Sequence, residues 1–139
     1  MQFDFLDPMR RDYRGRETDP GVSKEIVKGD IVDLECCDVV LASALKPSWG
    51  TAMEIRSAYA ELGKKVITVC PQDKPSPWLI EHSTKIVKTF EEAFEILKEL
   101  APTIRPSRVL VYLCGGINGL SDSDCTDWRE ATKEALKNI

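Results

Sequence analysis

The chain has 139 residues, of which 42% are hydrophobic and 30% are charged, as expected of one globular domain with a buried core. Its net charge of −4 argues against a nucleic-acid-binding surface, which needs clustered Lys and Arg. No apolar run approaches the ~20 residues of a membrane-spanning helix, and the first apolar stretch, which contains Asp4, does not resemble a signal peptide. The chain has five Cys without C-x-x-C spacing and a single His, which is not a zinc-binding pattern. We expect the cysteines to be reduced thiols of a cytoplasmic protein.

Predicted strands and helices alternate along the chain. Continuous apolar runs indicate buried strands, and apolar residues at helical spacing indicate helices. In chain order we expect a strand over 2–6, a helix over 22–36, a strand over 38–44, a helix over 51–62, strands over 65–70 and 85–88, a helix over 89–100, a strand over 108–114 and a helix over 127–137. This alternation predicts a single α/β domain over residues 1–139, flavodoxin-like or Rossmann-like, with a five-stranded parallel sheet and helices on both faces.

The glycine-rich turn in "VYLCGGINGL", residues 111–120, lies at the far end of the chain. In parallel α/β proteins a strand, a glycine turn and a helix of this kind usually open the domain. Joining residues 134–139 to residues 2–6 would give an ordinary helix–strand connection. The segment "APTIRPSR" at 101–108 has the composition of a linker. We therefore expect a circular permutant, natural or engineered, with strand 109–113 between strands 3–6 and 38–43.

Four motifs, taken in the rotated order, resemble the nucleoside 2-deoxyribosyltransferase family. They are "VYLCGGI", "DWRE", "GDIVDLECCDVVLA" and "PSWGTAMEI". The resemblance implies an enzyme that cleaves the N-glycosidic bond of a 2′-deoxynucleoside through a covalent glycosyl-glutamate intermediate and transfers the sugar to another purine or pyrimidine base. It implies no cofactor, and a homodimer or larger homo-oligomer in which a neighbouring subunit completes the active site.

The same resemblance assigns three catalytic residues. Glu54 becomes the nucleophile, and Tyr112 becomes the phenol that orients it. Asp30 becomes the group that handles the leaving base, or that holds the sugar and the catalytic glutamate. The residues alone leave other interpretations open, because Glu54 also completes a capping box with Thr51 and Tyr112 equally fits a core aromatic.

Asp30 also has an argument that needs no resemblance. It lies one helical turn from both Ile26 and Leu34, so it shares the inward face of the predicted helix. A carboxylate on that face costs several kcal/mol unless it is paired or faces a cleft. Asp33 is expected to point the other way, into solvent.

Further residues are expected to line a nucleoside pocket at the carboxyl ends of the strands, where α/β sheets bind ligands. They are Gly115, Gly116, Ile117, Asn118, Ser48, Gly50 and Met53. The spacing G-G-x-x-G differs from the dinucleotide fingerprint, so no nicotinamide cofactor is expected.

Ser48 departs from the transferase pattern, which has an acidic residue for the 5′-hydroxyl at that position. A hydroxyl can bind a phosphate that an aspartate would repel, so hydrolysis of a 2′-deoxynucleoside 5′-monophosphate stays open as an alternative. A non-catalytic nucleotide-binding domain is a third possibility. The glycine-rich loop has no arginine for a phosphate, and Arg10, Arg11 or Arg129 are the candidate substitutes. The basic stretch "MRRDYRGR" fits a solvated loop or an anion-binding segment equally well.

Overall fold

Five parallel strands form one sheet in the order β1-β5-β2-β3-β4, in a computed structural model that describes residues 1–117 and 119–137. The strands are β1 (Gln2–Leu6), β2 (Val39–Ser43), β3 (Lys65–Val69), β4 (Lys85–Val87) and β5 (Arg108–Gly115). The helices are α1 (Val22–Cys36), α2 (Trp49–Arg56), α3 (Pro77–Glu81), α4 (Phe90–Ile104) and α5 (Asp122–Leu136), with a short 3₁₀ turn η1 (Pro8–Arg10) and a π-helical segment η2 (Ser57–Glu61). The predicted α/β class and the parallel sheet are confirmed.

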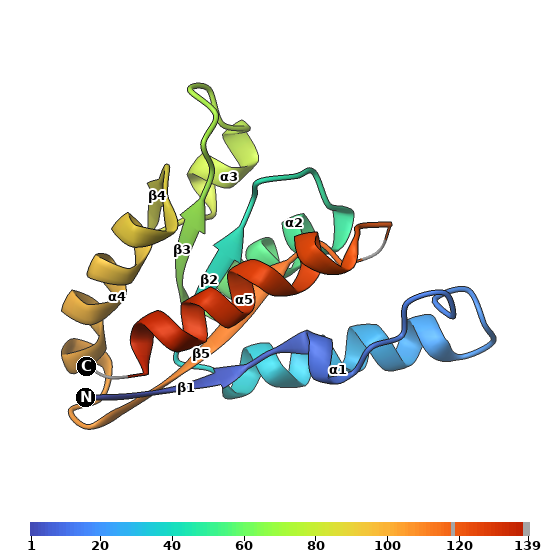
Figure 1. The fold of residues 1–139 in the computed structure, drawn as a ribbon, viewed down its shortest axis with the longest axis horizontal. Coiled ribbons are helices and arrows are strands. Elements are labelled where there is room, and N and C mark those ends of the chain that lie inside the picture. The colour runs from blue at the N-terminus through green and yellow to red at the C-terminus, as the bar shows by residue number, and fades with distance from the viewer. Residues whose placement is uncertain (118, 138–139) are drawn as a thin grey trace.

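Helices cover both faces of the sheet, because side chains of each strand alternate between the two faces. On one face, Val39 and Leu41 of β2 pack in a core with residues of α4 and α5. On the other face, Val40 and Ala42 pack with residues of α1, α2 and η2. Figure 1 shows α4 and α5 lying across the same face. This two-sided burial explains why the apolar run of β2 is continuous.

Strand β5 lies between β1 and β2 and pairs with both in parallel. Phe3 of β1 is paired with Val109, and Val39 of β2 with Val111. The predicted position of this strand is therefore confirmed, and in Figure 1 helix α5 ends at the end of the sheet where β1 begins. The circular permutation that motivated the prediction stays a hypothesis. Its expected linker is partly helical, since α4 continues to Ile104.

Several helices begin at other residues than expected, because a different residue is the N-cap. Helix α2 begins at Trp49, since Ser48 accepts a hydrogen bond from the Thr51 amide at 3.3 Å and is the N-cap. Helix α5 begins five residues earlier than predicted, because Ser121 caps it by accepting from the amide of Asp124. The short helix α3 lies in a segment that was expected to be a loop.

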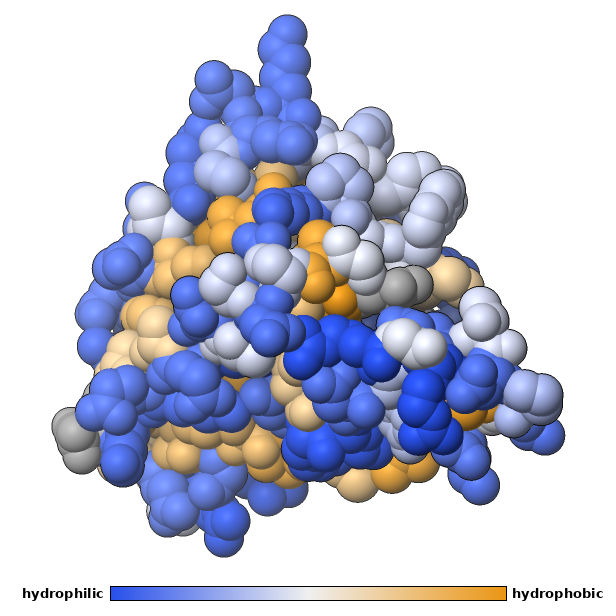
Figure 2. Space-filling view, turned by 45° about the vertical axis from the view of Figure 1, so that its right-hand side comes forward, coloured by the Kyte–Doolittle hydropathy of each residue, from blue (hydrophilic) through white to orange (hydrophobic). Residues whose placement is uncertain are grey.

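The molecular surface is mainly hydrophilic on the face drawn in Figure 2, with apolar residues visible in patches between the polar ones. Within residues 1–117 and 119–137, no helix combines the length and hydropathy needed to cross a membrane. Four of the five cysteines are buried and all five are unpaired, whereas Cys36 is exposed.

Candidate active site

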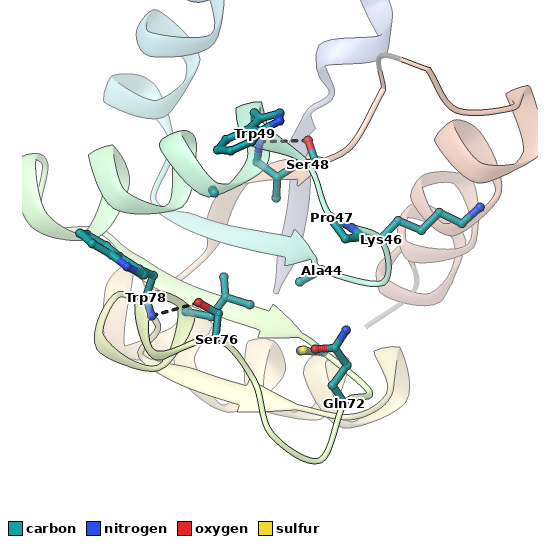
Figure 3. Close-up of a pocket in the computed structure, with 12 residues that line it drawn as sticks. Ala44, Lys46, Pro47, Ser48, Trp49, Gln72, Ser76 and Trp78 are labelled. Atoms are coloured by element: carbon teal, nitrogen blue, oxygen red, sulfur yellow. Dashed lines mark hydrogen bonds between the residues drawn. The ribbon is translucent and has the colours of Figure 1, made fainter.

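Two cavities open near the carboxyl ends of the strands, and they share Ser48 and Thr51 in their walls. The larger, of about 390 Å³, lies against α2 and α3, and Figure 3 shows the exposed Trp49 and Trp78 at its edge. The smaller, of about 280 Å³, contains both Glu54 and Asp30. Among the residues that the structure describes, none in the wall of the larger cavity is a carboxylate. We therefore identify the smaller one as the candidate active site, and call it the carboxylate cavity.

Glu54 lies in the second turn of α2 and meets Tyr112 of β5. The Tyr112 hydroxyl donates a hydrogen bond to Glu54 Oε2, and the Tyr112 side chain is completely buried. The alternative role of Glu54 in a capping box is wrong, because Ser48 rather than Thr51 caps the helix. Glu54 therefore lies beyond the first turn of the helix. A carboxylate in the first turn would have been stabilised by the helix dipole, and Glu54 is not. Its carboxylate instead has one oxygen held by a phenol and the other toward the cavity wall at Gly50, where an added Cβ would lie 3.7 Å from Oε1.

Burial raises the pKa of Glu54 from its ordinary 4.5 to about 7, and the negative charge of Asp30 contributes in the same direction. The hydrogen bond from Tyr112 opposes both effects, because it stabilises the charged form. Burial also raises the pKa of Asp30, although Arg11 opposes that rise. Two carboxyl groups, one of which raises the pKa of the other, thus face one cavity, an arrangement found at catalytic sites.

A chain of ion pairs supports Asp30 from the side of α1. Arg10 Nη2 contacts both carboxylate oxygens of Asp33, at 2.6 and 2.7 Å. Arg11 Nη2 lies 2.8 Å from Asp33 Oδ2 and 3.2 Å from Asp30 Oδ1. The expectation that Asp33 is solvated is wrong, since its side chain is only 7% exposed. The segment after β1 folds back over this face of α1 and covers it.

The walls of the carboxylate cavity include several residues that the sequence predicted, and others that it did not. Ser48, Gly50, Gly115 and Ile117 line it. Gly116 and Met53 are not in its wall, and Met53 is 70% exposed. Asn118, the remaining predicted residue, lies outside the described residues. The lining residues that were missed include Tyr13, Arg14 and Glu17 from the loop after η1, and their only signal was the polar stretch "DYRGRE".

The candidate phosphate-binding arginines are engaged elsewhere. Arg129 is completely buried and donates to the carbonyl oxygens of Gly115 and Cys125. Arg10 and Arg11 are held by aspartates, as described above. Arg14 lines the cavity and pairs with Asp12 and with Asp122, at the start of α5. The basic stretch is therefore neither a freely solvated loop nor an open anion site, since carboxylates neutralise most of its charges.

Comparison with known families bears on this site. The family model described as nucleoside 2-deoxyribosyltransferase matches residues 1–97, well over half of the chain. The matched segment includes Asp30 and Glu54, whereas Tyr112 lies beyond it. Searches of curated proteins and of solved structures found no match. Among residues 1–117 and 119–137, no group of three or more His, Cys, Asp or Glu side chains could hold a metal ion.

Proposed function

Since the chain belongs to the nucleoside 2-deoxyribosyltransferase family, we propose that it cleaves the N-glycosidic bond of a 2′-deoxynucleoside and transfers the deoxyribosyl group to another base. The observation that carries the proposal is the contact between Tyr112 and Glu54 beside Asp30. A buried phenol that fixes one oxygen of a carboxylate leaves the other oxygen free to attack. The carboxylate is also desolvated, which increases its reactivity once it is ionised.

Glu54 acts as the nucleophile in a double displacement. Its free oxygen bonds to the anomeric carbon as the bond from that carbon to the base nitrogen breaks. The bonding electrons leave with the base, which takes up a proton from solvent water. The ester that forms holds the sugar on Glu54. A nitrogen of the second base then attacks the same carbon as the bond from that carbon to the Glu54 oxygen breaks. The base loses its proton to solvent water, and the Glu54 carboxylate is released. Tyr112 stabilises the carboxylate before the first step and after the second.

Hydrolysis of a 2′-deoxynucleoside 5′-monophosphate is the second candidate, with water in place of the acceptor base. Ser48 favours it, because its side chain lies in the cavity wall without a negative charge. One observation weighs against it. The arginines nearby, Arg11 and Arg14, are paired with carboxylates and are not free to bind a phosphate.

One incubation separates these functions. The protein is mixed with a 2′-deoxynucleoside and a different free base, and in parallel with a 2′-deoxynucleoside 5′-monophosphate, and the products are separated chromatographically. A new nucleoside supports the transferase, and free sugar or sugar phosphate supports the hydrolase. No product from either substrate would contradict both and leave a binding domain. Glu54→Gln is the matched control, since it keeps the size of the side chain but cannot become the nucleophile.

Light scattering of the same sample tests the predicted homo-oligomer.

A further inference from the structure

The guanidinium of Arg11 lies against helix α1 at Gly29, where the absence of a side chain leaves room for it. A Cβ built on Gly29 would lie 2.9 Å from Arg11 Nε, 3.1 Å from Cζ and 3.2 Å from Nη2. Gly29 is in the interior of α1, where glycine costs stability relative to alanine. The glycine therefore has a structural use here, because any side chain would push the guanidinium away from the helix.

The guanidinium placed in this way bridges two carboxylates with a single nitrogen. Nη2 contacts Asp33 on one side and Asp30 on the other. Asp33 forms a second ion pair with Arg10. Asp33 is thereby fixed in place, and it in turn fixes the Arg11 guanidinium beside Asp30. The side chains of Arg11 and Asp30 are 25% and 18% exposed, so water screens their attraction less than it would at an open surface.

We propose that Arg11 is a positioning residue that keeps Asp30 ionised and directed into the carboxylate cavity, with Gly29 providing the space for it. This inference rests on the proposed function. It assigns to Asp30 the role of a hydrogen-bond acceptor for a sugar hydroxyl, and not that of a proton donor to the leaving base. A carboxylate that a cation holds in its charged form is a poor acid and a good acceptor.

The groups around Asp30 act in opposite directions on its charge. Asp33, one turn away on α1, is acidic and disfavours ionisation of Asp30. Glu54 faces Asp30 from α2, and the charge of Asp30 raises the pKa of Glu54. Arg11 and, at longer range, Arg10 favour it from the segment after β1. Tyr112 and Cys114 of β5 are neutral neighbours whose own ionisation the charge of Asp30 opposes. Without Arg11, the nearest cation is gone while burial and the acidic groups remain.

The test compares Arg11→Met, Arg11→Lys and Gly29→Ala with the wild type. Arg16→Met is the matched control, because Arg16 is in the same loop, is 64% exposed and pairs with Asp19 outside the cavity. Two quantities are measured for each protein: the pH at which the Asp30 carboxyl carbon titrates by NMR, and the pH dependence of kcat/KM for base release. Urea unfolding checks that each variant is folded. Arg11→Met should fold, because it leaves the ion pair between Arg10 and Asp33 in place.

For Arg11→Met we expect Asp30 to titrate at higher pH and kcat/KM for base release to fall across the pH range. Turnover should fall by up to about a hundredfold, the cost of misplacing a reacting group by about 1 Å. Gly29→Ala should act in the same way, Arg11→Lys should recover part of the loss because it keeps the charge, and Arg16→Met should match the wild type.

Unchanged titration of Asp30 in Arg11→Met would overturn the inference, even if turnover fell. Wild-type turnover in Gly29→Ala would overturn the role given to the glycine. A wild type that breaks no glycosidic bond would refute the proposed function instead, and the NMR titration would still decide whether Arg11 sets the charge of Asp30.

Discussion

Replacing Glu54 by Gln should stabilise the protein at alkaline pH while it abolishes turnover. In the folded state the pKa of Glu54 is raised from 4.5 to about 7, mainly by burial and secondly by the charge of Asp30. The native state therefore binds a proton more tightly than the unfolded chain, and the free energy of unfolding falls as the pH rises between these two values. The difference corresponds to about 3 kcal/mol, lost in full above the folded-state pKa.

Glutamine resembles the protonated glutamate and cannot ionise, and its amide oxygen still accepts the hydrogen bond from Tyr112. The variant should equal the wild type in stability near pH ~4, below the unfolded-state pKa, and exceed it by about 3 kcal/mol near pH ~8, or roughly 10 °C in Tm. Urea unfolding at the two pH values measures the effect, with the exposed Glu99→Gln as the control. If the two proteins differ equally at both pH values, Glu54 is not the desolvated carboxyl described above. If the variant keeps normal turnover, Glu54 is not the nucleophile.

Three further variants test neighbouring parts of the site. Asp30→Asn removes a like charge, so the pKa of Glu54 should fall and the acidic limb of kcat/KM should move to lower pH; a limb that stays in place would contradict the coupling. Tyr112→Phe removes a hydrogen bond that stabilises ionised Glu54, so the same limb should move to higher pH, and a shift in the other direction would refute this role. Gly115→Ala would bring a Cβ within 2.6 Å of Trp128 Cζ2 and should lower the free energy of unfolding by roughly 1–3 kcal/mol; a loss well below that in urea unfolding would mean that Trp128 moves aside freely.

The strands were predictable because their signal is local. The apolar runs at 38–44 and 65–70 contain β2 and β3 with at most one extra residue at each end. Helix starts were less predictable where two residues compete for the same role. Ser48 and Thr51 are both good caps, and only the folded chain shows that Ser48 accepts the amide of Thr51.

The site was less predictable than the fold, since its contacts join distant segments. Helical periodicity places Asp33 on the outer face of α1, and nothing local reveals that Arg10, twenty-three residues earlier, covers it. Spacing alone favoured a capping role for Glu54, and the family resemblance was needed to select it. The structure brings Glu54, Asp30 and Tyr112 together, and their catalytic roles stay predictions.

The position of β5 has a consequence for the order in which the protein matures on the ribosome. Strand β1 is synthesised before the other strands, but its neighbour in the sheet is β5. It therefore cannot pair until the ribosome has synthesised the chain through β5. Such a long closure between sequence-distant strands is slow. The strand that closes the sheet also delivers Tyr112 to Glu54, so a nascent chain that ends before Arg108 has neither a complete sheet nor an oriented carboxylate. Folding and acquisition of the site therefore finish in the same late event.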